Sequence, residues 1–265
     1  MPKSPAPRGR AAPSGRVRSL AKGLAILTAF AEARSALTLT KVSTITKMPM
    51  PTAFRMVSTL AEANYLERLP SGAYQPGLRA LTLAQATLHG SDLIHLAEPS
   101  LRTLADLTHQ TVNLAVLLDN QTLYLVRLRN SDLVTANIHV GSMLPAAYSS
   151  MGKVLLADLD PAELERRIGE TGLPPGYGPN AVTSIQALTR QLTRVRSQGF
   201  AIQDQEVARG LRSIAAPIRD HQNHVVASVN IAVKATDFTV ATILRDLKQP
   251  LMTTSHELSL RLGSH

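Results

Sequence analysis

The segment from Leu37 to Gln75 constrains the fold more than any other part of the chain. It contains a short helical stretch, a break at Thr46-Lys47-Met48, a longer helical stretch ending near Ala63, and two short β-type stretches around a Pro70-Ser71-Gly72 turn. A helix, a tight turn, a second helix and a hairpin in this order are typical of a winged helix-turn-helix. The sequence therefore predicts such a domain over residues 17–76.

The longer helix of this segment has one apolar and one polar face. Its apolar residues follow the helical i, i+3, i+4, i+7, i+8 spacing and are Ala53, Met56, Val57, Leu60 and Ala61. Thr52, Arg55 and Thr59 fall on the other face, where a helix lying in a major groove reaches base edges and phosphates. Proline is tolerated in a first helical turn, so we expect this helix to begin at Pro49 or Pro51.

Two flanking helices should support it, and a third should follow it. Ser19 is a candidate N-cap for a first helix, and Thr40 is one for a short helix over Lys41 to Ile45. A connecting helix is expected over residues 77–90. Its apolar residues occupy more than one face, which fits contact with a partner chain and a plain buried helix equally well.

The net charge of +9 lies entirely in the amino-terminal third of the chain. Residues 1–90 hold twelve basic and three acidic side chains, whereas residues 91–265 hold sixteen of each. A polyanion-binding module joined to a neutral module has this distribution. A disordered basic tail on a globular protein is the alternative, and residues 1–16, rich in Pro, Gly, Ala and Arg, are expected to form such a tail. Lys41, Lys47, Arg55 and Arg68 lie inside the predicted motif, however.

The absence of cysteine excludes disulfides, thiolate metal sites and cysteine nucleophiles, so the expected compartment is the cytoplasm. Lys22 interrupts the early apolar stretch, which argues against a signal peptide. No apolar run approaches the length that crosses a bilayer, and no membrane partner is expected.

Residues 91–265 alternate between helical and β-type stretches. The predicted helices are residues 92–108, 151–159, 161–170, 184–198 and 238–262, and the predicted strands are residues 111–118, 122–128, 133–139, 200–204, 211–218 and 225–233. Glu98-Pro99 marks either a kink or a junction of two helices. Runs of strands with helices between them indicate an α/β sensing domain with a largely antiparallel sheet. The whole chain is thus expected to be a two-domain α+β protein.

Several ordered motifs resemble the IclR-type transcriptional regulators. They are Ser19 to Leu27, Leu37 to Thr40, Pro51 to Arg55, Tyr65 to Arg68, Val140 to Pro145, Met151 to Ala157 and Gly210 to Pro217. The resemblance runs from about Ser19 to the end. It implies a winged helix-turn-helix, a linker helix and a GAF-like effector domain, assembled as dimers or dimers of dimers. It also implies a regulator of a catabolic operon, with operator DNA and a small effector as partners and no cofactor.

Within this family, Ser149 to Lys153, Gln205-Glu206 and Gly210 to Ser213 are most similar to the Pca and Pob regulators. Those regulators control aromatic-acid catabolism, including the β-ketoadipate route, so an aromatic or oxo carboxylic acid is the expected effector. One departure concerns Met50-Pro51, which stands where many members carry a polar pair. A hydroxyl and a backbone donor are therefore missing from the start of the helix, together with the phosphate contact that they would make.

The residues expected at the DNA come from the basic start, both helices of the motif and the wing. They are Arg16, Arg18, Lys41, Lys47, Pro51, Thr52, Arg55, Thr59 and Arg68.

An effector pocket is expected where Ser149 to Gly152 open a helix, because unpaired backbone N–H groups and the helix dipole favour a carboxylate. A capped helix without a ligand is the alternative. Position in the family pattern implies that Ser213 and Asn230 face the effector and that Gln203 occupies a position that is often acidic. The full set of expected effector residues is Asn113, Tyr148, Ser149, Ser150, Met151, Gly152, Gln203, Arg212, Ser213 and Asn230.

Two members of this set have structural alternatives. Asn113 interrupts an otherwise apolar strand and is as compatible with a hydrogen-bonded structural residue as with a ligand anchor. Arg212 is suited to pair either with a ligand carboxylate or with an acid of the protein. Gly152 would let a ligand approach the backbone closely.

An enzymatic interpretation competes with binding. Ser150 and Lys153 fit the S-x-x-K pattern of serine acyl enzymes, although neither an S-D-N nor a K-T-G partner is present. We expect no catalysis. His221 and His224 suggest a metal pair only weakly, because a solvated turn between two strands explains them and no further ligands converge. No metal site is expected.

Overall fold

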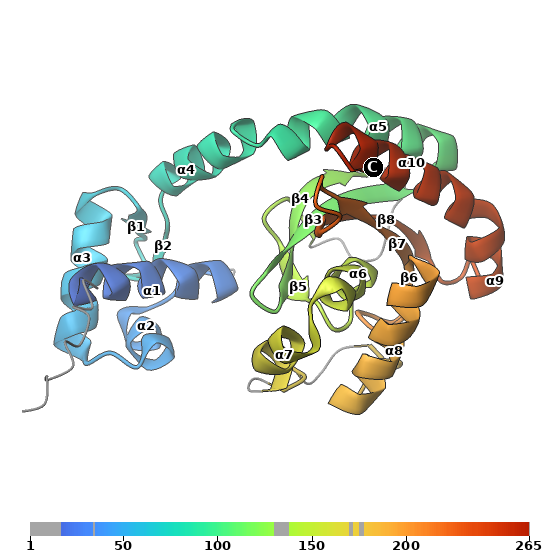
Figure 1. The fold of residues 1–265 in the computed structure, drawn as a ribbon. Coiled ribbons are helices and arrows are strands. Elements are labelled where there is room, and N and C mark those ends of the chain that lie inside the picture. The colour runs from blue at the N-terminus through green and yellow to red at the C-terminus, as the bar shows by residue number, and fades with distance from the viewer. Residues whose placement is uncertain (1–16, 34, 130–137, 170–171, 175–177, 265) are drawn as a thin grey trace, which may run out of the picture. The chain divides into compact units, whose positions relative to one another are not determined.

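The structure is a computed structural model that describes residues 17–33, 35–129, 138–169, 172–174 and 178–264 (Figure 1). The chain divides into two compact units, within residues 1–87 and 88–265. The expected tail of residues 1–16 and all but the last two residues of the expected strand 133–139 lie outside the described residues. Residues 138–139 are not part of a strand.

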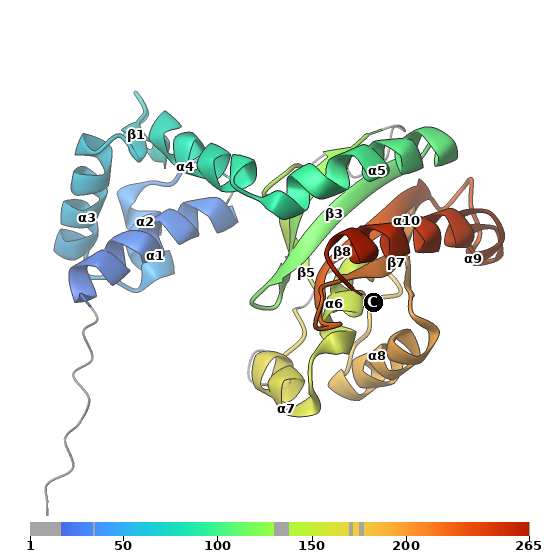
Figure 2. The same ribbon diagram turned by 45° about the horizontal axis from the view of Figure 1, so that its top comes forward.

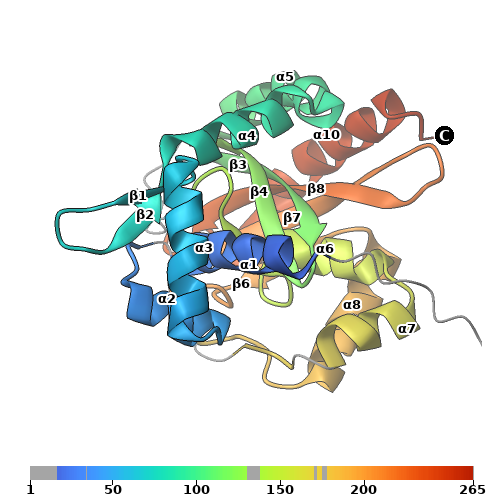
Figure 3. The same ribbon diagram turned by 90° about the vertical axis from the view of Figure 1, so that its left-hand side faces the viewer.

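The first unit is the predicted winged helix-turn-helix. Its elements are α1 (Arg18–Ala33), α2 (Leu39–Thr46), α3 (Met50–Glu62), β1 (Leu66–Arg68) and β2 (Tyr74–Pro76). The strands β1 and β2 are antiparallel, and Figure 3 shows their hairpin projecting beside α3. Ile26 and Phe30 of α1, Val42 of α2, and Ala53 and Val57 of α3 are buried together in one apolar core. The three helices therefore hold one another in place.

The turn between α2 and α3 is fixed by local hydrogen bonds. The Ser43 hydroxyl donates to the Met48 carbonyl at 2.7 Å, and Lys47 ends α2 in the left-handed conformation with φ 54°. Pro49 is the N-cap of α3, and Pro51 lies in its first turn, as predicted. The predicted caps of the first two helices were wrong, because Thr38 rather than Thr40 caps α2 and α1 begins at Arg18, before Ser19.

The helix α4 (Leu78–His89) follows the hairpin and leads into the second unit. None of its residues is buried, and the exposed fractions of Leu78, Leu81 and Leu83 are 83%, 56% and 56%. The next helix, α5 (Asp92–Thr108), is a single helix with Pro99 inside it rather than a junction of two helices.

The second unit contains a six-stranded sheet. Its strands are β3 (Thr111–Leu118), β4 (Gln121–Leu128), β5 (Met143–Pro145), β6 (Ala201–Asp204), β7 (Leu211–Arg219) and β8 (Val225–Lys234). The spatial order is β5-β4-β3-β8-β7-β6, and every neighbouring pair is antiparallel, which confirms the predicted sheet. The edge strand β5 was not predicted. Three residues are too few to show an alternating pattern in the sequence. The strand β5 forms because it pairs with β4.

Helices cover both faces of this sheet (Figure 2). The remaining ones are α6 (Ser150–Asp158), α7 (Pro161–Leu164), the π-helical turn η1 (Glu165–Gly169), α8 (Ile185–Gln198), α9 (Val240–Thr242), the π-helical turn η2 (Ile243–Leu247) and α10 (Lys248–Arg261). The helices α5 and α10 cover one face, and α6, with α8 packed on it, covers the other. No helix in the described part of the chain is long and apolar enough to cross a membrane.

Alternation along the strands separates two kinds of side chain. Val112 and Leu114 of β3 join the apolar core under α5 and α10, whereas Asn113, between them, points to the α6 face. The same two-residue period places Ile214 of β7 in that apolar core and Ser213 on the α6 face. Polar residues of several strands therefore gather beneath α6.

Candidate functional sites

The exposed face of α3 carries the predicted polar residues. Arg55 and Thr59 are exposed and Thr52 is half-buried, whereas Ala53 and Val57 on the opposite side are buried. This arrangement leaves the basic face of the helix open to a groove of DNA, as a recognition helix requires. The exposure of this face follows from the spacing of the apolar residues, because the side of the helix opposite a continuous buried stripe stays in contact with solvent.

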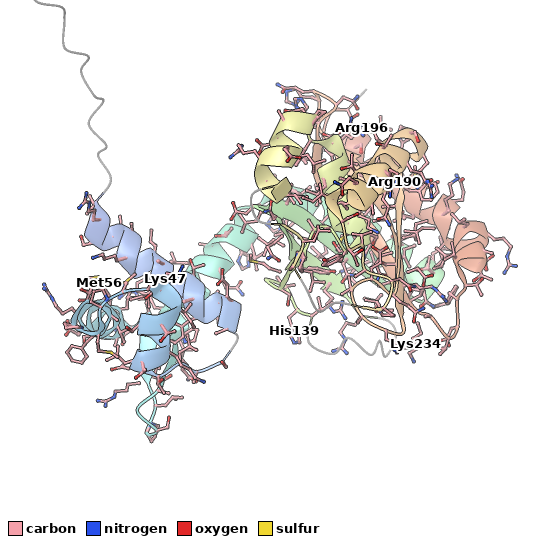
Figure 4. All side chains as sticks on the ribbon, turned by 90° about the horizontal axis from the view of Figure 1, so that it is seen from below. Lys47, Met56, His139, Arg190, Arg196 and Lys234 are labelled. Carbon is pink, nitrogen blue, oxygen red and sulfur yellow. The ribbon has the colours of Figure 1, made fainter. Side chains whose placement is uncertain are left out.

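The other basic residues expected at DNA are exposed on neighbouring elements. Arg18 lies on α1, Lys41 on α2, Lys47 in the turn before α3 and Arg68 on β1, and Figure 4 labels Lys47. Arg16 lies outside the described residues. All side-chain ion pairs that the described residues form lie within residues 88–265. The described basic side chains of the first unit therefore form no ion pair within the chain, and their charge is available to a polyanion such as DNA.

The start of α3 is apolar as well as exposed. Pro51 is exposed, and Met50 and Phe54 expose 41% and 53% of their surface. Phe54 was not among the predicted contacts. Its position beside Arg55, off the buried stripe, was the available indication. Apolar side chains on a recognition helix can contact the methyl group of thymine, a base contact that differs from the phosphate contact of a polar pair.

The α6 face of the sheet carries a line of polar side chains that crosses five strands, which we call the polar row. It consists of Arg127 on β4, Asn113 on β3, Asn230 on β8, Ser213 on β7, Gln203 on β6, and Ser150 at the first position of α6. The backbone register places Asn113 opposite both Arg127 and Asn230, and Ser213 opposite Gln203. Residues that are distant in sequence thus meet because of strand order.

Hydrogen bonds link most of the polar row into one chain. Arg127 Nη1 donates to Asn113 Oδ1 at 3.1 Å, and Asn113 Nδ2 donates to Asn230 Oδ1 at 2.7 Å. Asn230 Nδ2 lies 3.5 Å from Ser150 Oγ, which is 2.7 Å from Ser213 Oγ. Four residues predicted to face the effector, Asn113, Ser150, Ser213 and Asn230, are thereby brought into direct contact.

Both ends of the polar row have unsatisfied hydrogen-bonding groups. Gln203 is fully buried, and neither its Nε2 nor its Oε1 has a hydrogen-bond partner. Arg127 is half-buried, its Nε is buried without a partner, and burial lowers the pKa of its guanidinium. Buried polar groups are nearly always paired, so these unpaired groups are candidates for contact with a ligand.

The start of α6 differs from the expected anion site. Ser149 is its N-cap and accepts the N–H of Gly152 at 2.9 Å, while its hydroxyl also meets that of Thr122 at 2.8 Å. A Cβ on Gly152 would lie 2.3 Å from both the Cα and the carbonyl oxygen of Ala146. Gly152 therefore allows the chain itself to approach the helix closely, which explains the glycine without a ligand.

Three other expected effector residues have structural contacts. Met151 is fully buried in the core beneath α6, and the Tyr148 hydroxyl donates to the Pro174 carbonyl at 2.6 Å. Arg212 projects away from the polar row, where its Nε donates to Asp204 at 2.6 Å and its Nη1 to two backbone carbonyls. The structure places Arg212 with an acid of the protein, which was the structural alternative.

The serine and lysine of the S-x-x-K pattern have separate partners. Ser150 contacts Ser213 and Asn230, whereas the Nζ of Lys153 donates to the Glu206 carboxylate. The lysine charge is thus engaged elsewhere, and the geometry gives no support to the acyl-enzyme interpretation. Glu206 was not predicted as a partner, because nothing in a loop sequence shows which buried group it meets.

The described residues contain no group of three or more His, Cys, Asp or Glu side chains that could hold a metal ion. His221 and His224 lie in the turn between β7 and β8. The Asp220 carboxylate accepts the backbone N–H groups of Gln222 and His224 there, at 2.9 and 3.0 Å. Asp220 therefore stabilises this turn through hydrogen bonds to its backbone.

Comparison with known families assigns both units. Residues 19–70 match the "IclR helix-turn-helix domain", and residues 85–260 match the family "Bacterial transcriptional regulator IclR C-terminal". The second match alone covers more than half of the chain.

Individual relatives agree with these matches. The Pca regulon regulatory protein of Pseudomonas putida is 31% identical over 92% of this chain and 84% of its own length. The transcriptional repressor IclR of Escherichia coli is 28% identical over 86% of both chains. Among solved structures, a transcriptional regulator from Rhodococcus sp. RHA1 has a TM-score of 0.74 at 31% identity, over 94% of this chain and 99% of that one. An IclR homologue from Microbacterium hydrocarbonoxydans, complexed with 4-hydroxybenzoate, has a TM-score of 0.72 at 27% identity, over 92% and 98%.

Proposed function

This chain belongs to the IclR family of bacterial transcriptional regulators, and from that premise we propose that it controls a catabolic operon in response to a small aromatic or oxo carboxylic acid. It acts in the cytoplasm as a homodimer or a dimer of dimers, with one recognition helix per half-site of its operator. Its DNA contacts come from α3, the turn before it and the wing.

The observation that carries the DNA-binding role is the unpaired positive charge around α3. Lys41, Lys47, Arg55 and Arg68 are exposed, and the side-chain ion pairs of the described residues all lie in the other unit. Phosphate contacts of this kind supply affinity and register, and in this proposal Arg55 and Thr59 read the bases.

The polar row supports the effector role. It contains a half-buried guanidinium and a fully buried amide with unsatisfied groups, which suit a small polar anion. The relative named for the Pca regulon and the homologue complexed with 4-hydroxybenzoate support a carboxylic acid of the aromatic-catabolic type.

The helix α4 supports self-association. An apolar helix with no buried residue in a single chain exposes leucine side chains to water, which a second copy of the chain would cover. We therefore propose α4 as a dimer contact and as the element whose position the effector changes.

The test combines selection of bound DNA with effector titration. Full-length protein should enrich a two-fold symmetric sequence from a random duplex pool, and a binding carboxylic acid should change its affinity for that sequence in fluorescence anisotropy. Absence of any enriched sequence would refute the DNA-binding role. Enrichment without a response to any acid would refute the proposed effector class.

A further inference from the structure

The first two turns of α3 expose apolar side chains beside Arg55. Within residues 50–56, the exposed side chains are those of Met50, Pro51, Phe54 and Arg55. In a helix-turn-helix, the residues at the N-terminal end of the recognition helix are the ones that contact base edges. The part of α3 that is suited to contact bases is therefore mainly apolar.

Met50, Pro51 and Phe54 form one continuous surface, which we call the α3 patch. Phe54 follows Met50 by four residues and Pro51 by three, and residues at these spacings are neighbours on the surface of a helix. The core of this unit does not include these side chains, since Ala53 and Val57 pack into it instead. A continuous apolar surface in water is unfavourable, and polar surroundings mark it as an interaction site.

Basic side chains flank the α3 patch. Lys47 lies in the turn before α3, Arg55 follows Phe54, and both are exposed. The acidic residue of the same helix, Glu62, lies eight residues after Phe54, about 12 Å further along the helix axis. A second copy of the chain that met this surface through a two-fold contact would place like charges against each other. The charges therefore favour double-stranded DNA as the partner.

The major groove offers a methyl group to such a surface. Base edges there carry hydrogen-bond donors and acceptors, and thymine adds its 5-methyl group. Arg55 suits the O6 and N7 acceptors of guanine. The Thr59 hydroxyl donates to the Arg55 carbonyl at 2.9 Å, so it offers a base only its lone pairs. Because the polar part of this face is small, apolar contacts must supply part of the sequence specificity.

We infer that Met50 and Phe54 contact the 5-methyl groups of thymine in the major groove and thereby determine part of the operator sequence. Each half-site then contains thymine at positions where even uracil, which lacks only the methyl group, lowers the affinity. This inference rests on the proposed function, since it names the chemistry that the recognition helix contacts.

Deoxyuridine tests the methyl group alone, because it keeps the base pairing and the O4 acceptor of thymidine. In the sequence enriched by the full-length protein, each symmetric pair of thymidines is replaced by deoxyuridine, and affinity is measured by fluorescence anisotropy at one salt concentration. Replacement at a contacted position should weaken binding by about fourfold per methyl group, the equivalent of one buried methylene. Replacement in the flanking sequence should leave the affinity unchanged.

Variants assign the contacts to side chains. Phe54→Ala and Met50→Ala should weaken binding to the thymidine operator, and each should lose the discrimination against deoxyuridine at one or more positions. Arg55→Ala should weaken binding but keep this discrimination. Leu107→Ala, which removes a 66% exposed leucine from α5, is the control and should change neither quantity. Melting temperatures establish that each variant is folded, and Phe54→Ser provides a second variant at that position.

The outcomes distinguish this inference from the proposed function. If no sequence is enriched, the DNA-binding role itself fails. If a sequence is enriched and deoxyuridine equals thymidine at every position, the methyl contact is refuted while the DNA-binding role stands. If deoxyuridine weakens binding equally in the wild type and in the folded variants of Met50 and Phe54, the assignment to these residues is refuted. If Phe54→Ala lowers the mass measured by light scattering, the α3 patch packs against a second copy of the chain, and the inference is overturned.

Discussion

The ammonium group of Lys153 donates a hydrogen bond to the carboxylate of Glu206, and only 2% and 7% of the two side chains is exposed. This contact ties the first turn of α6 to the loop between β6 and β7. Burial lowers the pKa of Lys153 and raises the pKa of Glu206, so each charge is maintained by the other. The pair is therefore a point where a single substitution has a large effect.

Lys153→Met should lower the free energy of unfolding by about 3–5 kcal/mol, because it leaves the Glu206 carboxylate buried and uncompensated. The double variant with Glu206→Gln should recover most of this loss, since no charge then remains. Urea denaturation of the single and double variants measures the difference. Equal stability of the wild type and Lys153→Met would contradict the buried ion pair.

The same variant should become sensitive to pH. Without Lys153, the pKa of Glu206 in the folded state stays above its unfolded value of about 4.3, so the folded state binds more protons than the unfolded state between those two pKa values. Stability is then greatest at low pH and falls as pH rises through the folded pKa. Denaturation of Lys153→Met and of the double variant, compared between about pH 5 and pH 8, should show this slope only in the single variant.

Gly152→Ala should destabilise the effector unit by about 1–3 kcal/mol or more, because the added Cβ would lie 2.3 Å from backbone atoms of Ala146. Gly23→Ala is the matched control, since Gly23 is also helical and its added Cβ meets nothing within 4 Å. The control should gain roughly 0.5–1 kcal/mol from helix propensity. Thermal unfolding should show a lower melting temperature than the wild type for Gly152→Ala and a higher one for Gly23→Ala. If Gly152→Ala were as stable as the wild type, α6 would have to shift to make room for the added Cβ.

Arg55→Ala should weaken binding to the selected operator by about 1–3 kcal/mol if Arg55 contacts a base, with a smaller effect on random DNA. Arg194→Ala removes another exposed arginine, from α8 of the other unit, and controls for net charge. Fluorescence anisotropy at one fixed salt concentration gives both affinities. Unchanged affinity of Arg55→Ala for both DNAs would remove α3 from the interface.

Leu81→Glu should shift the oligomer towards the monomer, because it places a charge on the exposed apolar surface of α4. Thr87→Glu on the same helix is the control, as Thr87 is an exposed polar residue. Light scattering coupled to gel filtration measures the mass of each variant. A Leu81→Glu protein with the wild-type mass would exclude α4 from the dimer contact.

The helices and the sheet were predictable to the extent that their patterns are local. The stripe of buried residues on α3 and the alternation in β3 are visible in the sequence, because packing one face of an element imposes a period on its own residues. Thr38 and Thr40 were not distinguishable as caps, since both precede the same short helix with side chains of identical chemistry.

The polar row was predictable only in part. Asn113 stood out as a polar residue in an apolar strand, but its contact with Asn230 depends on β3 and β8 being neighbours. Arg127 was not predicted, because a single arginine near the end of a strand usually faces water, and its half-burial follows from the position of β4. The role of Gly152 depended on the close approach of Ala146, which no local pattern shows.

The pairing of β3 with β8 also has a consequence for synthesis on the ribosome. The contact between Asn113 and Asn230 joins residues 117 positions apart, so the centre of the sheet cannot close until almost the entire chain has emerged. The winged helix-turn-helix has all its core residues within its own segment and is complete much earlier. During translation, the part that reads DNA can therefore assume its native form while the part that would report on the metabolite is still unfinished.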